Sequence, residues 1–271
     1  MTVVRSRLLF ASALCAAALA AAGQTNGGSG MVHFAGGAFM MGTDPARVDE
    51  LMARFNVRRR DIFLPELPAH SVTLRPFSIE RTEVTNATFK GFLDRHPEWS
   101  RDRLPPDRHN GDYLKTWIGG GFPPGEGRLP VTFVTWGAAV AYCESLGRRL
   151  PAEAEWEFAA GGGRAIEFPW GDEMPGKASA NWSGTGLGKP AAVGSFSPGV
   201  TGLYDMAGNV WEFVQDKWRD SYAATSESPD RRVIRGGSFE GAPVNLRVRY
   251  RDSHPEKGAG PHVGFRCARS G

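Results

Sequence analysis

Cysteine is scarce in this sequence. Three cysteines occur among 271 residues, at positions 15, 143 and 267, and none lies between Ser238 and Asp252. The histidines are scattered without the spacing of metal ligands, so neither a Cys/His zinc site nor a three-histidine iron site is indicated. Any chemistry in the C-terminal third must therefore proceed without a thiol pair.

The sequence also has no block of like charge. Lysine and arginine number 32 against 29 acidic residues, which gives a formal net charge of +3. Such a balance, without a run of basic residues, argues against nucleic acid as a partner. Glycine and proline are abundant instead, with 35 and 19 residues, and they indicate a loop-rich fold without long helices.

A long apolar run lies near the N-terminus. Arg5 and Arg7 precede the apolar residues 8–22, and small residues follow. This layout predicts a signal peptide over 1–23, then a flexible leader over 24–30 and one domain over 31–271. A membrane anchor is the alternative, but the run is shorter than the ~20 residues that a spanning helix needs. We therefore expect a periplasmic or secreted protein with no stable membrane insertion after cleavage.

Removal of the signal peptide would leave two cysteines, Cys143 and Cys267. In an oxidising compartment two such thiols usually form a disulfide. Two buried free thiols are the alternative.

Local patterns predict short elements within one domain. Apolar spacing favours helices over 44–58, 86–93, 136–146 and 152–160, with Thr85 as the N-cap of the second. Other stretches favour strands over 31–44, around a Gly-Gly turn, and over 72–79, 232–234, 246–251 and 263–268. The polar segment 101–128 carries aromatic residues, which indicates that it packs on the domain.

Eight motifs follow one another along the chain: GGAFMMGTD, FSIERTEVTNATF, LPVTFVTWGAAVAYC, GRRLPAEAEWEFAA, FPWGD, GLYDMAGNVWEF, RVIRGGSF and GFRCAR. Together they resemble the sulfatase-modifying-factor, or formylglycine-generating enzyme, family from about residue 31 to residue 269. The resemblance implies the α+β fold class, as a single C-type-lectin-like domain with little regular secondary structure. It also implies that Cys143 pairs with Cys267.

The resemblance further implies structural calcium at GLYDMAGNVWE. Carried over residue by residue, the ligands would be Asp205, the carbonyl groups of Gly208 and Val210, and the carboxylate of Glu212. Calcium prefers several such hard oxygen ligands at ~2.3–2.6 Å. A cap-and-turn motif without metal is the alternative.

The catalytic thiols of the family are missing. The first thiol position aligns with Gly241, and the second falls between Val244 and Leu246. Soft sulfur ligands suit Cu(I), whereas glycine and apolar side chains do not bind it. We therefore expect no copper and no formylglycine-generating activity.

Several polar side chains remain near these positions. His254 and Glu256 are candidates for a catalytic acid and base, although solvated loop side chains are the alternative. Arg247 and Arg249 would share one face of the predicted strand, where they would bind an acidic substrate or pair with core carboxylates. Trp211 is a further candidate for substrate binding.

Two functions are consistent with these features. One thiol-free branch of the family matures a siderophore, by oxidation of the pyoverdine chromophore. Resemblance to it favours an exported oxidoreductase that acts on a small-molecule or peptide-derived substrate. The alternative is a non-catalytic binding or maturation-partner module of the same fold.

Overall fold

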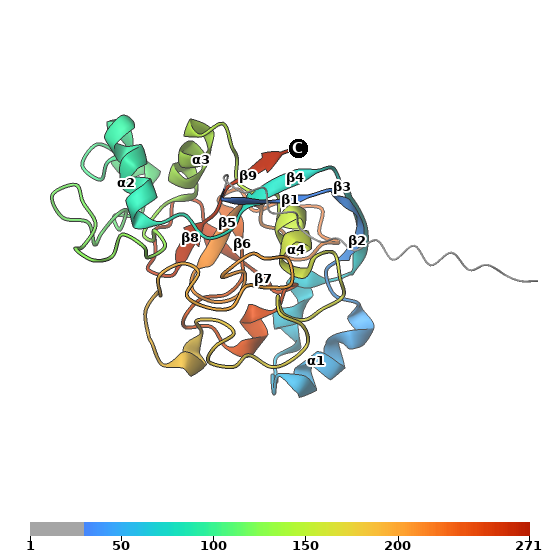
Figure 1. The fold of residues 1–271 in the computed structure, drawn as a ribbon. Coiled ribbons are helices and arrows are strands. Elements are labelled where there is room, and N and C mark those ends of the chain that lie inside the picture. Colours follow the sequence, from blue (N-terminus) through green and yellow to red (C-terminus); the bar gives the residue numbers. More distant parts are fainter. Residues whose placement is uncertain (1–29) are drawn as a thin grey trace, which may run out of the picture.

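A computed structural model describes residues 30–271 of the chain. The predicted signal peptide and nearly all of the leader lie outside the described residues. The described part is an α+β domain of three small sheets and four α-helices joined by long loops (Figure 1). None of its helices combines the length and apolar character that crossing a membrane requires.

The sheets bring together segments that are distant in the sequence. One sheet has the order β1–β4–β9, a second pairs β2 with β3, and a third has the order β7–β6–β5–β8. Within the third sheet β5 and β8 run parallel, while the other pairs are antiparallel. Their bounds are β1 Met31–Phe34, β2 Gly37–Met41, β3 His70–Leu74, β4 Phe77–Glu80, β5 Trp211–Lys217, β6 Arg231–Arg235, β7 Arg251–Pro255, β8 Val263–Phe265 and β9 Ala268–Ser270.

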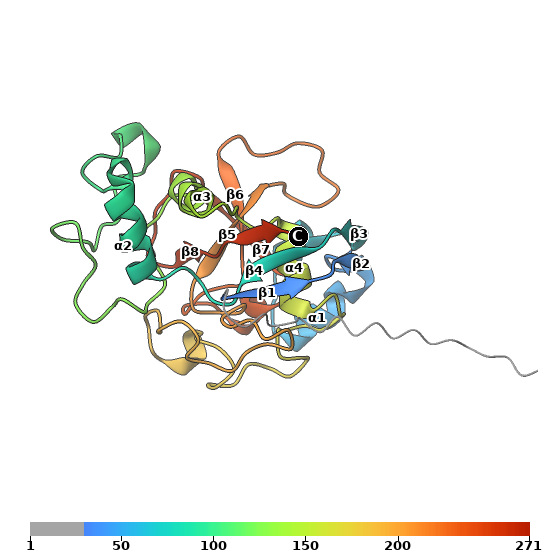
Figure 2. The same ribbon diagram turned by 45° about the horizontal axis from the view of Figure 1, so that its top comes forward.

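The helices are short, and two of them begin at a threonine N-cap. The N-cap of α2 is Thr85, whose hydroxyl accepts a hydrogen bond from the Thr88 amide. Two views place α2 and the loop after it at one end of the domain (Figures 1 and 2). The bounds are α1 Val48–Arg54, α2 Asn86–Arg95, α3 Trp136–Ser145 and α4 Glu153–Gly161.

Most predicted elements exist, but two strand predictions are wrong. Residues Pro243–Leu246 form a 3-10 helix, and turns follow before β7 begins at Arg251. The predicted strand over 263–268 is split into β8 and β9, which belong to different sheets. Between these two strands Cys267 is bonded to Cys143 of α3, and the Cα atoms are 5.6 Å apart.

Four arginines lie in the protein interior and face buried carboxylates. Such pairs fix packing, because removal of one partner leaves an uncompensated buried charge and costs ~3–5 kcal/mol. The pairs are Arg235 with Glu153 and Glu157, Arg247 with Glu66 and Glu167, Arg251 with Glu153, and Arg266 with Glu212.

Candidate functional site

The positions of the missing thiols lie next to each other in the structure. An ideal Cβ atom built on Gly241 would be 3.6 Å from the Cβ atom of Asn245. Two cysteines joined by a disulfide have their Cβ atoms ~3.8 Å apart. The sequence left the second thiol position open between Val244 and Leu246, and this geometry favours Asn245. The backbone arrangement for a cysteine pair is therefore present without the sulfur atoms.

This geometry predicts that a thiol pair can be rebuilt. The double variant Gly241→Cys/Asn245→Cys is expected to form an internal disulfide, because the backbone φ of Gly241 is not positive and only backbone atoms of Ser238, its oxygen at 3.0 Å and its nitrogen at 3.3 Å, must shift slightly. Both thiols should resist alkylation until a reductant is added. Each single variant serves as control and should alkylate at once; prompt alkylation of the double variant would contradict the pairing.

The half-buried Asn245 side chain lies beside a buried aromatic residue, Tyr250. Its amide oxygen accepts a hydrogen bond from the Ala242 amide at 2.9 Å, and its amide group donates to the Tyr250 oxygen. Burial is the main reason why the pKa of Tyr250 is raised to about 12. The rings of Tyr250 and Trp211 have centroids 6.0 Å apart, and both residues belong to the main hydrophobic core. Trp211, predicted to bind substrate, is thus a largely buried neighbour of the former thiol site.

Glu256 lines a separate open cavity of about 240 Å³. Its backbone is fixed on both sides, since its amide donates to the Asp230 carbonyl and its carbonyl accepts from the Trp136 amide. Carboxylate oxygen Oε2 accepts a hydrogen bond from Arg232 Nε at 3.1 Å. The guanidinium of Arg232 also stacks on Trp136, with its carbon 3.6 Å from the ring centroid. Glu256 is therefore an oriented carboxylate at a cavity wall.

The other walls of this cavity are aromatic and basic. Trp99 and Trp136 supply ring surface, while Arg108 and Lys257 supply positive charge. These residues come from the 99–108 loop, the start of α3 and the loop after β7. No sequence pattern singled them out, because they meet only through the tertiary fold.

His254 does not share this cavity wall. Its ring packs against Phe213 with centroids 5.7 Å apart, and its Nε2 atom is buried without a hydrogen-bond partner. Burial, together with the positive charge of nearby groups, lowers the pKa of His254 to about 4. The side chain is neutral near pH 7, and it is placed beside the Glu256 loop rather than in the open cavity.

A second cavity, of about 250 Å³, adjoins the former thiol segment. Phe239 of the GGSF motif lines it, together with Phe133, Lys189 and Pro261. Phe133 has a positive φ of 55°, which is uncommon for a bulky residue and costs free energy. Both cavities are bordered by residues of the segments 99–116, 129–137 and 256–261. Each is therefore a candidate ligand cavity.

The two arginines predicted on one strand have interior roles. Arg247 is fully buried and donates to Glu66 at 2.8 and 3.0 Å and to Glu167 at 2.6 Å. Arg249 donates to the Ile166 carbonyl at 3.1 Å. Because the strand is replaced by a 3-10 helix and turns, the side chains point to the 166–167 segment. Of the two roles expected for Arg247, the structure shows pairing with core carboxylates.

The segment expected to hold calcium is buried and rich in oxygen. Glu212 is already engaged, because Arg266 donates to both of its oxygens at 2.7 Å and Trp156 Nε1 donates at 2.8 Å. Asp205 Oδ2 accepts a hydrogen bond from the Gly194 amide at 2.7 Å, and the Asp205 carboxyl group also interacts with that of Glu83. As placed, Asp205 fits a cation better than Glu212 does.

Glu83 adds a carboxylate that the sequence did not suggest. Its Oε1 accepts from Asn209 at 3.0 Å, whereas Oε2 is buried without a partner. Burial and the nearby negative charge of Asp205 raise the pKa of Glu83 well above its usual range. Burial also raises the pKa of Asp205. A cation bound between these two groups would offset the rise in both pKa values. Within residues 30–271 no cluster of three His, Cys, Asp or Glu side chains is placed to hold a metal ion, so the other ligands of such a cation would be backbone carbonyl groups or water.

We therefore expect calcium to stabilise the protein through Asp205 and Glu83. Chelation with EDTA should lower the unfolding temperature by a few degrees, and added Ca²⁺ should restore it, because a ligand of the folded state stabilises that state. Differential scanning calorimetry measures the change. Asp205→Asn should lose the calcium response, whereas the exposed Asp107→Asn should keep it. An unfolding temperature that is insensitive to both EDTA and Ca²⁺ would contradict the site.

Comparison with known proteins agrees with the fold and the motifs. Residues 16–271 match the family described as the sulfatase-modifying factor enzyme 1-like domain. The inactive C-alpha-formylglycine-generating enzyme 2 of Mus musculus is 32% identical over 283 residues, which cover 89% of this chain and 85% of that protein.

Two further relatives bear on chemistry. Hercynine oxygenase of Mycolicibacterium thermoresistibile is 34% identical over 254 residues, which cover 80% of this chain and 54% of that protein, so the chain spans about half of it. Among solved structures, PvdO from Pseudomonas aeruginosa has a TM-score of 0.66 and 29% identity, with 89% of this chain and 94% of that chain covered.

Proposed function

Because the chain belongs to the sulfatase-modifying factor enzyme family, we propose that it is an exported oxidoreductase that carries out an oxidative step in the maturation of a natural product. Its substrate would be a small-molecule or peptide-derived compound. Similarity to a hercynine oxygenase and to PvdO supports an oxidative role. A pyoverdine-type siderophore chromophore is the specific candidate, supported by the resemblance of the sequence to the thiol-free branch of the family.

Formylglycine formation is not part of the proposal. None of the residues aligned with the two thiol positions, Gly241 and 244–246, is a cysteine, and the cysteines within residues 30–271 are joined in one disulfide. No free thiolate is thus present in the described part of the chain for Cu(I) binding or disulfide exchange.

The observation that carries the proposal is the position of Glu256. One of its oxygens is held by Arg232, and no other side chain of the described part donates to the carboxylate. Its side chain keeps 29% of its surface exposed, and it borders the cavity. A carboxylate fixed at one oxygen and open at the other can accept a proton from a bound substrate.

The rest of the cavity suits a planar substrate. Trp99 and Trp136 offer aromatic faces for stacking. Arg108 and Lys257 place positive charge at the same cavity, which favours acidic or phenolic groups. The second cavity, at Phe239, would hold the remainder of a peptide-derived compound.

The reaction would balance as a two-electron oxidation. A dihydro substrate loses two electrons and two protons as a ring double bond forms. Glu256 accepts one of the protons, and dioxygen, the expected acceptor, is reduced to hydrogen peroxide as it takes up two electrons and two protons. Glu256 is then returned to its ionised form. Residues of the chain supply binding, orientation and proton transfer in this scheme.

A comparison of extracellular metabolites tests the proposal. A strain without the gene is expected to accumulate a precursor that is two hydrogen atoms richer than the product of its parent, as seen by mass spectrometry. Restoring the gene should remove the precursor. An unchanged metabolite profile would favour the alternative function, a non-catalytic module of the same fold.

A further inference from the structure

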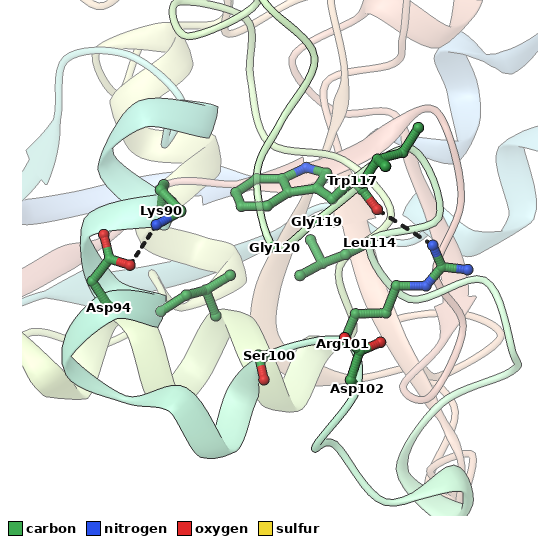
Figure 3. Close-up of a pocket in the computed structure, with 11 residues that line it drawn as sticks. Lys90, Asp94, Ser100, Arg101, Asp102, Leu114, Trp117, Gly119 and Gly120 are labelled. Carbon is green, nitrogen blue, oxygen red and sulfur yellow. Dashed lines mark hydrogen bonds and ion pairs between the residues drawn. The ribbon is translucent and has the colours of Figure 1, made fainter.

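Two buried histidine nitrogens beside the candidate site have no hydrogen-bond partner in the described part of the chain. They are Nε2 of His254 and Nδ1 of His262, near the two ends of the connection between β7 and β8. Polar groups at other hollows are better matched. In the open cleft of about 480 Å³ beside α2 (Figure 3), Lys90 pairs with Asp94, and Arg101 donates to two backbone carbonyls.

The backbone that follows β7 covers the ring of His254. An ideal Cβ atom on Gly258 would lie 2.7 Å from His254 Nε2, and one on Gly260 would lie 3.7 Å from Cε1 of the same ring. On another side the ring contacts Phe213 of β5. The buried Nε2 atom therefore faces a glycine-rich backbone segment that gives it no hydrogen bond.

This segment, residues 257–261, is named the β7–β8 loop. Backbone hydrogen bonds fix the residues on either side of it. Within the loop the Ala259 carbonyl accepts from the Asn110 side chain at 3.2 Å, and the Gly260 carbonyl accepts from the Phe133 amide at 2.8 Å. Ala259 is its one side chain in the main hydrophobic core. A loop with so few attachments can open locally while the strands at its ends stay paired.

The β7–β8 loop contributes to both cavities of the candidate site. Lys257 lines the cavity of Glu256, and Pro261 lines the cavity of Phe239. An opening of the loop would therefore change the walls of both cavities at once.

No carboxylate of the described part accepts a hydrogen bond from the buried nitrogens. Glu256 is engaged by Arg232, and Asp252 accepts from the Ser253 amide. Glu240 Oε2 lies 3.9 Å from His262 Nδ1, which is too far for a hydrogen bond. The charged groups of the surrounding elements are Arg231 and Arg232 of β6, Asp252 of β7, Glu256 and Lys257 after it, and Glu240 before the 3-10 helix.

Protonation of His254 is opposed as long as the loop is closed. A charged imidazole carries hydrogen on both nitrogens, so Nε2 would become a buried donor without an acceptor. Burial is the main reason why the pKa of His254 is lowered to about 4, and the nearby His262 and Arg231 act in the same direction. In a solvated loop the ring would have its ordinary pKa of about 6.5. Between these two pH values the open loop binds a proton that the closed loop does not, so acid favours opening.

We propose that the β7–β8 loop is an acid-sensitive gate of the candidate site, in which protonation of His254 releases the loop and withdraws Lys257 and Pro261 from the two cavities. Near pH 7 the ring is neutral, the loop is closed over it, and both cavities keep their walls. In acid the loop opens and binding to either cavity weakens. The proposal concerns the loop itself and does not depend on the oxidative function.

Hydrogen exchange of the mature chain, followed by NMR and corrected for the intrinsic effect of pH, tests the gate. Exchange of the loop amides and of the Phe133 amide is expected to become about twentyfold faster between pH 7 and pH 5. This change follows from a His254 pKa of about 4 in the closed loop and about 6.5 in the open one. The Glu80 amide, which donates to the Cys267 carbonyl elsewhere in the domain, is the internal control and should not change.

Variants separate the histidine from other effects of acid. His254→Gln, which stays neutral at every pH, should lose the response, whereas His96→Gln, at the end of α2, should keep it. Constant exchange of the wild-type loop between pH 7 and pH 5 would overturn the proposal, as would an undiminished response of His254→Gln.

A glycine substitution gives a second measurement, because glutamine at 254 also alters the packing. The added methyl group of Gly258→Ala would press on His254 Nε2. Exchange of the loop amides should then be faster already at pH 7, with the Glu80 amide unchanged. Loop exchange equal to that of the wild-type protein would count against the gate, since the ring and the loop would not be in contact.

Discussion

Replacement of Glu256 with glutamine is expected to lower the rate of substrate oxidation by a factor of about 10²–10⁴, which is the usual loss when a positioned general base is removed. Glutamine has almost the same shape as glutamate, and its amide oxygen can still accept the hydrogen bond from Arg232. The Trp136 stack and the backbone hydrogen bonds of residue 256 should persist. We therefore expect the variant to lose proton transfer while the structure of the cavity stays unchanged.

Accumulation of the two-hydrogen-richer precursor in a strain that carries Glu256→Gln measures this effect. Glu240→Gln is the matched control, because Glu240 lies near the former thiol site, its side chain is 65% exposed, and it borders neither cavity of the candidate site. The control strain should make normal product. If siderophore fluorescence forms normally with Glu256→Gln, Glu256 is not the base.

Loss of the disulfide is expected to have the largest effect on stability. Cys143 and Cys267 are fully buried and are separated by 124 residues in the chain. A cross-link over a loop of this length restricts the unfolded chain strongly, which amounts to ~4–5 kcal/mol in the chain-entropy model. Domains of ordinary stability have a free energy of unfolding of only ~5–15 kcal/mol. Cys143→Ala/Cys267→Ala should therefore lose a large fraction of the free energy of unfolding.

Urea unfolding with and without reductant measures this loss. Reduction of the wild-type protein should lower its free energy of unfolding by nearly as much as the double substitution does. The double variant is its own control, since reductant should not change it further. Equal stability of the oxidised and reduced wild-type protein would show that the cross-link contributes nothing.

Local elements of the fold were predictable from the sequence. Thr85 begins α2 as an N-cap, because its hydroxyl satisfies a free amide of the first turn, and this signal is local. The helix over 136–145 follows from its alanine-rich, apolar spacing. The strand predicted over 246–251 is absent. Alternation of Arg247 and Arg249 with apolar residues suggested a strand face, but this segment follows a 3-10 helix, and Arg247 pairs with buried carboxylates while Arg249 donates to a backbone carbonyl.

The candidate site was predictable only in part. Glu256 was identified from the sequence, but its partner Arg232 and the ring of Trp136 were not, because they are 24 and 120 residues away along the chain. The unpartnered oxygen of Glu83 beside Asp205 was likewise not predictable from the sequence. Burial and pairing depend on contacts between distant segments, and one sequence does not reveal them.

The sequence by itself determined the family, the α+β fold class and the absence of the thiol pair, since these depend on which residues are present and in what order. Tertiary structure alone decided that Gly241 and Asn245 face each other, that Arg247 serves the core, and that Glu256 borders an aromatic cavity. The physical reason is that a charged side chain pays a desolvation cost when buried, so its role is set by the partners that the fold brings to it.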